Sequence, residues 1–289
     1  MFNKIVVGVD GRAGGRDAVA LARILAAPDA RISLAHVHGH RAAVRTRAPD
    51  EAESRRLLET EREACDIDAD VISVPADSIG QGLHQVADVA GADLLVVGSC
   101  SRGVAGRVLL GDDTRAALDG APCAVAIAPS GYAGETRPFA TVGVGYDGTR
   151  LGAEALGVAR EIADARGAKL RVRQVVSIPL TPGAGYAGSA WGSAMVVEVE
   201  EAQRDLDRLP DVDAKAVLGM VNDELVSFSD SVDLLVIGAR RYGPMHRFVL
   251  GTVAQYLAGH ARCPLLALPL TPDPAQDSPA TATAAGVSA

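Results

Sequence analysis

The sequence predicts an α/β protein of two tandem, doubly wound domains, each built on a five-stranded parallel sheet. Short runs rich in Val, Ile and Leu alternate with segments whose apolar residues have helical spacing. This is the pattern of a parallel sheet that is covered by helices on both faces. The length of 289 residues suits about two domains. The same order of motifs occurs twice along the chain, which predicts two copies of one domain.

The repeat can be aligned without gaps at three places. These are DLLVVGSCSRGVAGRVLLG (93–111) with DLLVIGARRYGPMHRFVLG (233–251), APCAVAIAP (121–129) with ARCPLLALP (261–269), and GVDGRAGG (8–15) with GYDGTRLG (145–152). We therefore expect one domain at 1–130 and a second at 139–270. The linker at 131–138 is polar, rich in Gly and ends in Pro138, as is typical of a domain boundary. The tail at 271–289 has no apolar periodicity, which predicts disorder.

In each half, strands and helices follow one another in a regular order. The predicted strands of the first half are KIVVGV (4–9), RISLAHV (31–37), DADVISV (68–74), DLLVVG (93–98) and CAVAIAP (123–129). The helices between them are RDAVALARILAA (16–27), DEAESRRLLETEREA (50–64), DSIGQGLHQVADVAG (77–91) and the short DDTRAALDG (112–120). The second half repeats this order from FATVGVGY (139–146) to PLLALP (264–269).

Two loop motifs point to a binding crevice in each half. In a doubly wound sheet of strand order 3-2-1-4-5, ligands bind beyond the carboxyl ends of strands one and four, where the order reverses. Asp10 and Gly98 follow these strands in the first half, and Asp147 and Gly238 follow them in the second. As single residues, the aspartates also suit a turn or a helix cap, and both interpretations remain open at this point.

Composition excludes several classes of protein. Hydrophobic residues make up 48% and aromatic residues 3%, so the core is expected to consist of Val, Leu, Ile and Ala. The net charge of −8 argues against nucleic acid as a partner, because phosphates are bound by Lys and Arg. No segment has the ~20 apolar residues of a membrane span or the pattern of a signal peptide. The four cysteines show no CxxC spacing, which favours a reduced, cytoplasmic protein.

The glycine loop after the fourth strand resembles that of the universal stress protein family. Nucleotide-binding members carry glycine, two residues, glycine, nine residues, glycine, and then Ser or Thr. The resemblance includes the strand-end aspartates and the APCA and ARCP turns, and it covers the chain up to Pro269. It implies a Rossmann-like, adenine nucleotide alpha hydrolase-like fold. It also implies ATP or another adenine nucleotide as the ligand, which Mg²⁺ could accompany.

In the first half, the resemblance assigns five positions. It implies that Asp10 binds the ribose or the base-side hydroxyls, that Val37 lies by the adenine, and that Gly98 and Gly111 hold the phosphate loop. Ser101 stands where the family has its middle glycine.

Asp112 stands where the family has Ser or Thr. An Asp at a helix start is a good N-cap that stabilises by ~1 kcal/mol. A carboxylate ~4 Å from a phosphate costs about 4 kcal/mol at an effective dielectric of 20, which is close to a thousandfold in affinity. We therefore expect the first half to have lost the ordinary phosphate site.

In the second half, the loop is basic and keeps the final pair of the motif. The resemblance implies that Asp147 binds the ribose or the base-side hydroxyls and that Val175 lies by the adenine. The candidate nucleotide-binding residues are Asp147, Val175, Gly238, Arg240, Arg241, Gly251 and Thr252. Thr252 can cap the next helix without adding charge, and an arginine could bind a phosphate in a fork geometry. Arg241 replaces the middle glycine, and a solvated loop is the alternative for these arginines. If only one half binds nucleotide, we expect it to be the second.

Two further patterns have less specific interpretations. His36, His38 and His40 alternate, so a strand would place them on one face, where they could bind zinc or copper. The second half has QVVSI at this place, and we favour exposed or lightly packed histidines without a metal. Cys100 lies in no GxSxG elbow and is interpreted as a packing residue.

The sequence leaves three functions open. The first is a stress-response binding or signalling module, and the second is an interaction protein with degenerate nucleotide sites. The third is a weak ATPase, which is least favoured because no general base or metal pair is evident. The short apolar last strands, at sheet edges, invite pairing. They predict an intramolecular pseudo-dimer of the two domains, and a homodimer is a further arrangement that the sequence allows.

Overall fold

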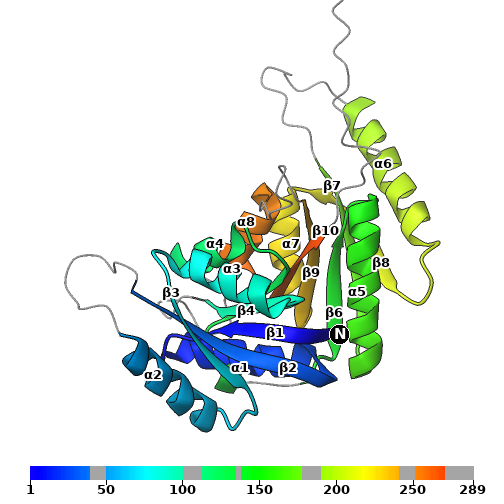
Figure 1. Ribbon diagram of the computed structural model, residues 1–289. Coiled ribbons are helices and arrows are strands. Elements are labelled where there is room, and N and C mark those ends of the chain that lie inside the picture. The colour runs from blue at the N-terminus through cyan, green and yellow to red at the C-terminus, as the bar shows by residue number, and fades with distance from the viewer. Residues whose placement is uncertain (40–49, 100–111, 135–137, 178–189, 241–250, 271–289) are drawn as a thin grey trace, which may run out of the picture.

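The computed structural model describes residues 1–39, 50–99, 112–134, 138–177, 190–240 and 251–270 (Figure 1). Several positions of the sequence analysis lie outside the described residues. These are His40, Cys100, Ser101, Gly111, Arg241, the tail 271–289, and the side chains of Asp112 and Arg240.

Both halves contain the predicted elements in the predicted order. The first half comprises β1 (Phe2–Gly8), α1 (Ala13–Leu25), β2 (Ala26–His38), α2 (Glu51–Ala64), β3 (Asp70–Pro75), α3 (Ile79–Ala90), β4 (Leu94–Gly98), α4 (Asp112–Leu118) and β5 (Ala124–Ala128). A short 3₁₀ turn, η1 (Tyr132–Gly134), follows. The second half comprises β6 (Thr141–Tyr146), α5 (Arg150–Arg166), β7 (Lys169–Ser177), α6 (Ala190–Leu206), β8 (Asp213–Gly219), α7 (Val221–Ser229), β9 (Leu234–Arg240), α8 (Thr252–His260) and β10 (Leu265–Leu270).

All of these strands belong to one sheet. Its order is β3-β2-β1-β4-β5-β10-β9-β6-β7-β8, so each half has the predicted order 3-2-1-4-5. Within each half the neighbouring strands are parallel. The two last strands, β5 and β10, pair antiparallel with Ala126 opposite Leu266. The two halves therefore share one continuous sheet, whose edges are β3 and β8.

Helices cover both faces of the sheet (Figure 1). One core lies under α1, α2, α5 and α6, and the other lies under α3, α4, α7 and α8. Strand β4 supplies both cores, since Leu94 and Val96 face the first and Leu95 and Val97 face the second. This follows from the alternation of side chains along a strand, and it explains why the strands are apolar without interruption.

Strand β2 is longer than predicted. It begins at Ala26, directly after α1, rather than at residue 31. Ala26 pairs with Phe2 at the start of β1, and the register shifts before Lys4. Arg166, at the end of α5, donates hydrogen bonds to the carbonyls of Ile24 and Ala26 at 2.8 and 3.0 Å. The α1–β2 junction is therefore held by the other half of the chain, a contact that local sequence cannot reveal.

The helix starts follow ordinary capping chemistry. The Asp50 carboxylate accepts from the Glu53 amide at 2.9 Å, and the Glu53 carboxylate accepts from the Asp50 amide at 3.1 Å. This is a capping box. Ser78 and Thr149 cap α3 and α5 through their hydroxyls. None of the helices in the described part of the chain is long and apolar enough to cross a membrane.

Candidate functional site

The topology brings the carboxyl ends of the first and fourth strands together in each half. Strands β1 and β4 are neighbours, with Val7 opposite Val96. Strands β6 and β9 are neighbours in the same way, with Gly145 opposite Ile237. The strand order reverses at these two pairs, so a crevice of the ligand-binding type is expected at each.

The two strand-end aspartates form turns. Asp10 accepts a hydrogen bond from the Arg12 amide at 3.0 Å. Asp147 accepts from the amide and the hydroxyl of Thr149 at 3.0 and 2.6 Å. The residue after each aspartate is a glycine with positive φ, +75° at Gly11 and +74° at Gly148, a conformation that favours glycine. The repeated Asp-Gly pair therefore has a local, turn-forming role in both halves.

Gly98 ends β4 and has a packing role. A Cβ atom at this position would lie 2.0 Å from the backbone oxygen of Gly14, in the first turn of α1. The end of β4 therefore lies directly against the α1 backbone. Its counterpart Gly238 lies inside β9 opposite Leu268, because β9 continues as far as Arg240.

The two valines assigned to the adenine lie in different surroundings. Val37 is 4% exposed and belongs to the core. A Cβ on Gly82 of α3 would lie 2.6 Å from its Cγ2, so α3 covers this side chain closely. Val175 is only partly buried, on β7 opposite Val217. The valine of the second half is therefore the more accessible of the two.

The last helices begin differently in the two halves. The N-cap of α8 is Gly251, with no side-chain cap, and Thr252 is the first helical residue. The interpretation of Thr252 as the cap is thus wrong, because the helix begins one residue earlier than expected. The first turn of α8 contains no acidic residue. Helix α4 starts at Asp112 itself, followed by Asp113, so Asp112 is also within the first turn rather than before it.

Two buried polar atoms near the carboxyl ends of the strands were not predicted from the sequence. Ser99, directly after β4, is 4% exposed, and its hydroxyl has no hydrogen-bond partner among the described residues. In the second half, the side-chain oxygen of Gln174 is likewise buried without a partner among them. A Cβ on Gly148 would lie 3.8 Å from the Gln174 amide nitrogen, so Gln174 lies beside the Asp147–Gly148 turn. Because buried acceptors normally have partners, both atoms mark positions that a ligand could satisfy.

The histidines of β2 are not exposed or lightly packed, as the sequence suggested. His36 and His38 are 8% and 9% exposed. The Nδ1 of His36 lies 2.7 Å from the Ser54 hydroxyl, which also accepts from Ser73 at 2.7 Å. Ser54 is buried on α2, and this tertiary contact covers the strand end. Within the described ranges, no three His, Cys, Asp or Glu residues are grouped as metal ligands.

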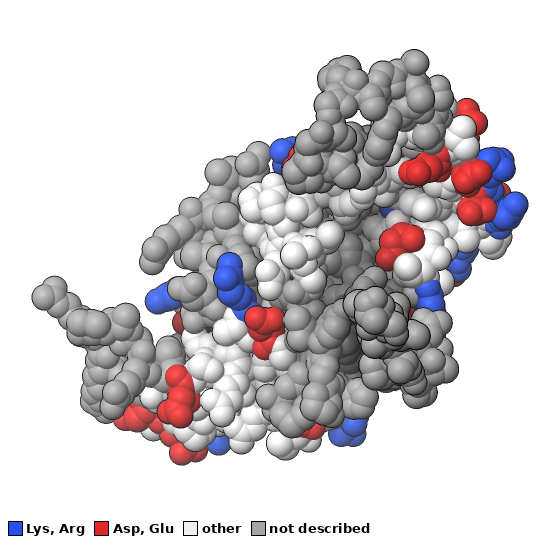
Figure 2. All heavy atoms as spheres, turned by 90° about the horizontal axis from the view of Figure 1, so that it is seen from above, with Lys and Arg blue, Asp and Glu red and all other residues white. Residues whose placement is uncertain are grey.

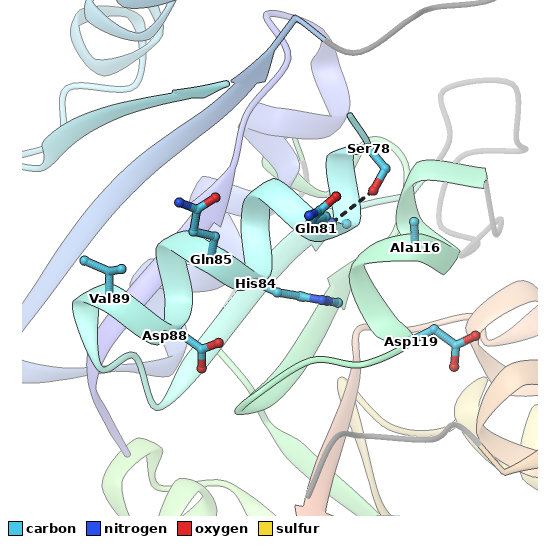
Figure 3. A pocket seen from close by; sticks show the side chains of 9 residues that line it. Ser78, Gln81, His84, Gln85, Asp88, Val89, Ala116 and Asp119 are labelled. Carbon is cyan, nitrogen blue, oxygen red and sulfur yellow. Dashed lines mark hydrogen bonds between the residues drawn. The ribbon is translucent and has the colours of Figure 1, made fainter. Parts of the chain in front are cut away.

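A separate groove of about 690 Å³ lies between α3 and α4 (Figure 3). His84 crosses it and donates to the carbonyl of Ala117 at 2.8 Å. Its lining residues are Ser78, Gly80, Gln81, His84, Gln85, Asp88, Val89, Ala116 and Asp119. None of the nucleotide-site residues assigned from the sequence is among them.

Charges of both signs occur on the face shown in Figure 2. Seen from above in Figure 2, basic and acidic side chains are interspersed on the described part of that face. No broad basic surface is visible on this part.

A comparison with known protein families agrees with the resemblance found in the sequence. The sequence profile of the universal stress protein family matches residues 1–129 and 138–269. The chain belongs to the universal stress protein family. A curated universal stress protein of Mycobacterium tuberculosis is 30% identical over 195 residues, which span 61% of this chain and 61% of that relative.

Solved structures show the same fold. A universal stress protein of Pseudomonas aeruginosa covers 93% of each chain with a TM-score of 0.67 and 18% identity. One of Archaeoglobus fulgidus covers 92% of this universal stress protein and 98% of its own chain, with a TM-score of 0.63 and 14% identity.

Proposed function

We propose that this universal stress protein binds an adenine nucleotide, ATP or AMP, in the crevice of its second half. In this proposal it acts as a binding or signalling module of the stress response rather than as an enzyme. The nucleotide would lie beyond the carboxyl ends of β6 and β9, with its phosphates toward the start of α8. Mg²⁺ could accompany the phosphates.

The observation that carries this proposal is the buried oxygen of Gln174. It lacks a partner among the described residues and lies beside the Asp147–Gly148 turn. A ribose hydroxyl or the adenine amino group could donate to it. The neighbouring Val175 is partly accessible for an apolar contact with the base. The exposed amides at the start of α8 suit a phosphate, because a helix N-terminus attracts anions.

The residues of the first half are less suitable for binding a nucleotide. Val37 is covered by α3, and α4 begins with Asp112 and Asp113. Two acidic residues in the first turn of α4 would bring negative charge close to the phosphates, and like charges repel. We therefore expect asymmetric binding, with the second half as the nucleotide site.

We also propose that the chain consists of two domains that pair with each other. Residues 1–130 and 139–270 would be two domains, joined by the linker 131–138, that form an intramolecular pseudo-dimer. Support comes from the antiparallel pairing of β5 with β10. The hydrogen bonds from Arg166 to the carbonyls of Ile24 and Ala26 add a second contact between the halves.

Gly251→Asp should weaken ATP binding at least tenfold. A Cβ at this position meets nothing within 4 Å, so the variant should fold, but it places a carboxylate at the start of α8. Titration calorimetry with ATP measures the effect. Gly251→Asn is the matched control, since it has nearly the same size and no charge, and it should retain binding. Gly111→Asp in the first half should have no effect, and an equal loss there would contradict the asymmetry.

Asp112→Ser should create a second binding event for ATP. The substitution removes a charge from the first turn of α4, while serine remains acceptable at a helix start. The melting temperature should therefore change little. If the melting temperature falls sharply and titration shows no second site, Asp112 is structural, and Ser101 becomes the residue to test next.

A further inference from the structure

The internal repeat places two equivalent grooves at the junction of the halves. Each is bounded by the first helix of one half and by the starts of the last two strands of the other. What we call the linker groove is the place of the linker turn, where Asp17 on α1 binds Gly131 and Ala133 and where Asp233 and Cys263 from the second half lie near Tyr132. The open groove comprises the equivalent residues, Glu154 on α5 with Asp93 and Cys123 from the first half. The volume of the open groove is about 610 Å³.

The equivalence extends to hydrogen bonding. Asp93 accepts from the amides of Asn3 and Lys4 at 2.8 and 3.0 Å. Asp233 accepts from the amides of Ala140 and Thr141, both at 2.8 Å. The strands that border the two grooves are thus anchored in the same way in both halves.

The linker groove is filled by the chain itself. After β5, the chain turns at Gly131, whose φ is +83°. The Asp17 carboxylate, 2% exposed, accepts from the amides of Gly131 and Ala133 at 2.9 and 2.8 Å. Between them, Tyr132 packs against the core. Burial, together with the charges of Asp233 and Cys263, raises the pKa of Tyr132 well above its ordinary value. A turn with one tyrosine and two donating amides is therefore what this kind of groove accommodates.

Among the described residues, the chain after β10 does not repeat the turn that follows β5. Strand β5 ends at Ala128, but β10 runs two residues beyond the equivalent Leu268 and pairs as far as Leu270. Thr271 and Pro272 stand where the linker has Gly131 and Tyr132. A threonine resists the positive φ that the turn requires, and proline has neither an aromatic ring nor an amide hydrogen.

The charge of the open groove fits a donor of hydrogen bonds. Among the described residues, Glu154 forms an i,i+4 pair with Arg150 at 2.8 Å in which both side chains are partly exposed, and such pairs contribute little. Glu161 pairs with the amino group of Met1 at 3.5 Å. Asp273, at the place equivalent to Ala133, would add a further carboxylate to these. The residues that follow β10 are thus a poor match in charge as well as in shape.

We propose that the open groove is a docking site for a tight turn of a partner protein that carries one tyrosine flanked by small residues. The tyrosine would lie toward Asp93 and Cys123, as Tyr132 lies toward Asp233 and Cys263, and the amides of the turn would donate to Glu154. This docking does not depend on nucleotide binding.

A capped peptide with the sequence of residues 130–134, Ser-Gly-Tyr-Ala-Gly, is the probe. Fluorescence anisotropy with the full chain should show saturable binding, and the same peptide with Tyr→Ala should bind at least tenfold more weakly. Gly157→Gln should also reduce binding at least tenfold. Gly157 lines the groove, and a Cβ there meets nothing within 4 Å, so the side chain enters the groove without disturbing α5. An unchanged unfolding midpoint checks this point, and Val89→Gln on the exposed surface of α3 should leave binding intact.

A photo-crosslinking amino acid at position 157 of the full chain identifies the occupant. Capture of the peptide through residues near its tyrosine supports the proposal. Failure of the peptide to bind, or equal binding of the Tyr→Ala peptide, overturns it. An internal crosslink to residues 271–289 also overturns it, since the chain would then cover its own groove. A crosslink to residues 185–188 of a second copy, where Gly-Tyr-Ala-Gly recurs, would replace a separate partner by self-association.

Discussion

Replacing Gly98 with alanine is expected to lower the free energy of unfolding by about 3 kcal/mol. The new Cβ would lie 2.0 Å from the backbone oxygen of Gly14 and 2.5 Å from its carbonyl carbon. Because both are backbone atoms, β4 and α1 would have to move apart. Chemical denaturation followed by circular dichroism measures the change in midpoint.

Gly157→Ala is the matched control for this substitution. It lies in the interior of α5, where a Cβ meets nothing within 4 Å. Alanine is a better helix former than glycine, so this variant should be more stable than the parent by about 0.5–1 kcal/mol. If Gly98→Ala left the midpoint unchanged, the close approach of β4 and α1 would not explain the glycine. A binding role for Gly98 would then become the better explanation.

Asp17→Ala is expected to lower the free energy of unfolding by about 3 kcal/mol, because hydrogen bonds to charged groups contribute roughly 1.5–3 kcal/mol each. The buried carboxylate accepts from the Gly131 and Ala133 amides, and its removal leaves both donors without their acceptor. The linker should also become more sensitive to proteolysis near Tyr132, which depends on this turn for its position.

The equivalent residue of the second half is the control. Glu154→Ala removes only a partly exposed pair with Arg150, which should change the free energy of unfolding by about 0.5 kcal/mol or less. Equal destabilisation by the two substitutions would contradict the difference in burial and hydrogen bonding between Asp17 and Glu154.

Much of the fold could be predicted because it depends on residues that are close together in the sequence. The Asp-Gly turns after β1 and β6 need only a glycine with positive φ and an aspartate that binds the amide two residues on. The start of α2 follows from Asp50 and Glu53, three residues apart. The uninterrupted apolar strands likewise reveal a sheet that is buried on both faces.

The candidate site was less predictable. The glycine pattern correctly drew attention to Gly98, yet its close contact with Gly14 depends on how α1 packs on β4. Gln174 carried no signal in the sequence, because a single glutamine is unremarkable until its oxygen is seen to be buried without a described partner. Thr252 was expected to cap α8, but a shift of one residue in the helix start places Gly251 there.

The sequence by itself determined the two-fold repeat, the order of strands and helices, and the turns that end β1 and β6, since each arises from residues close together in the chain. Only the tertiary structure decided which of two equivalent acidic residues is buried. Asp17 and Glu154 occupy equivalent positions in the repeat, but Asp17 is buried by contact with Gly131, 114 residues away, whereas Glu154 stays partly exposed. Burial and hydrogen bonding of this kind depend on surfaces that meet only when the chain is folded, so residues that are equivalent in the repeat acquire different roles.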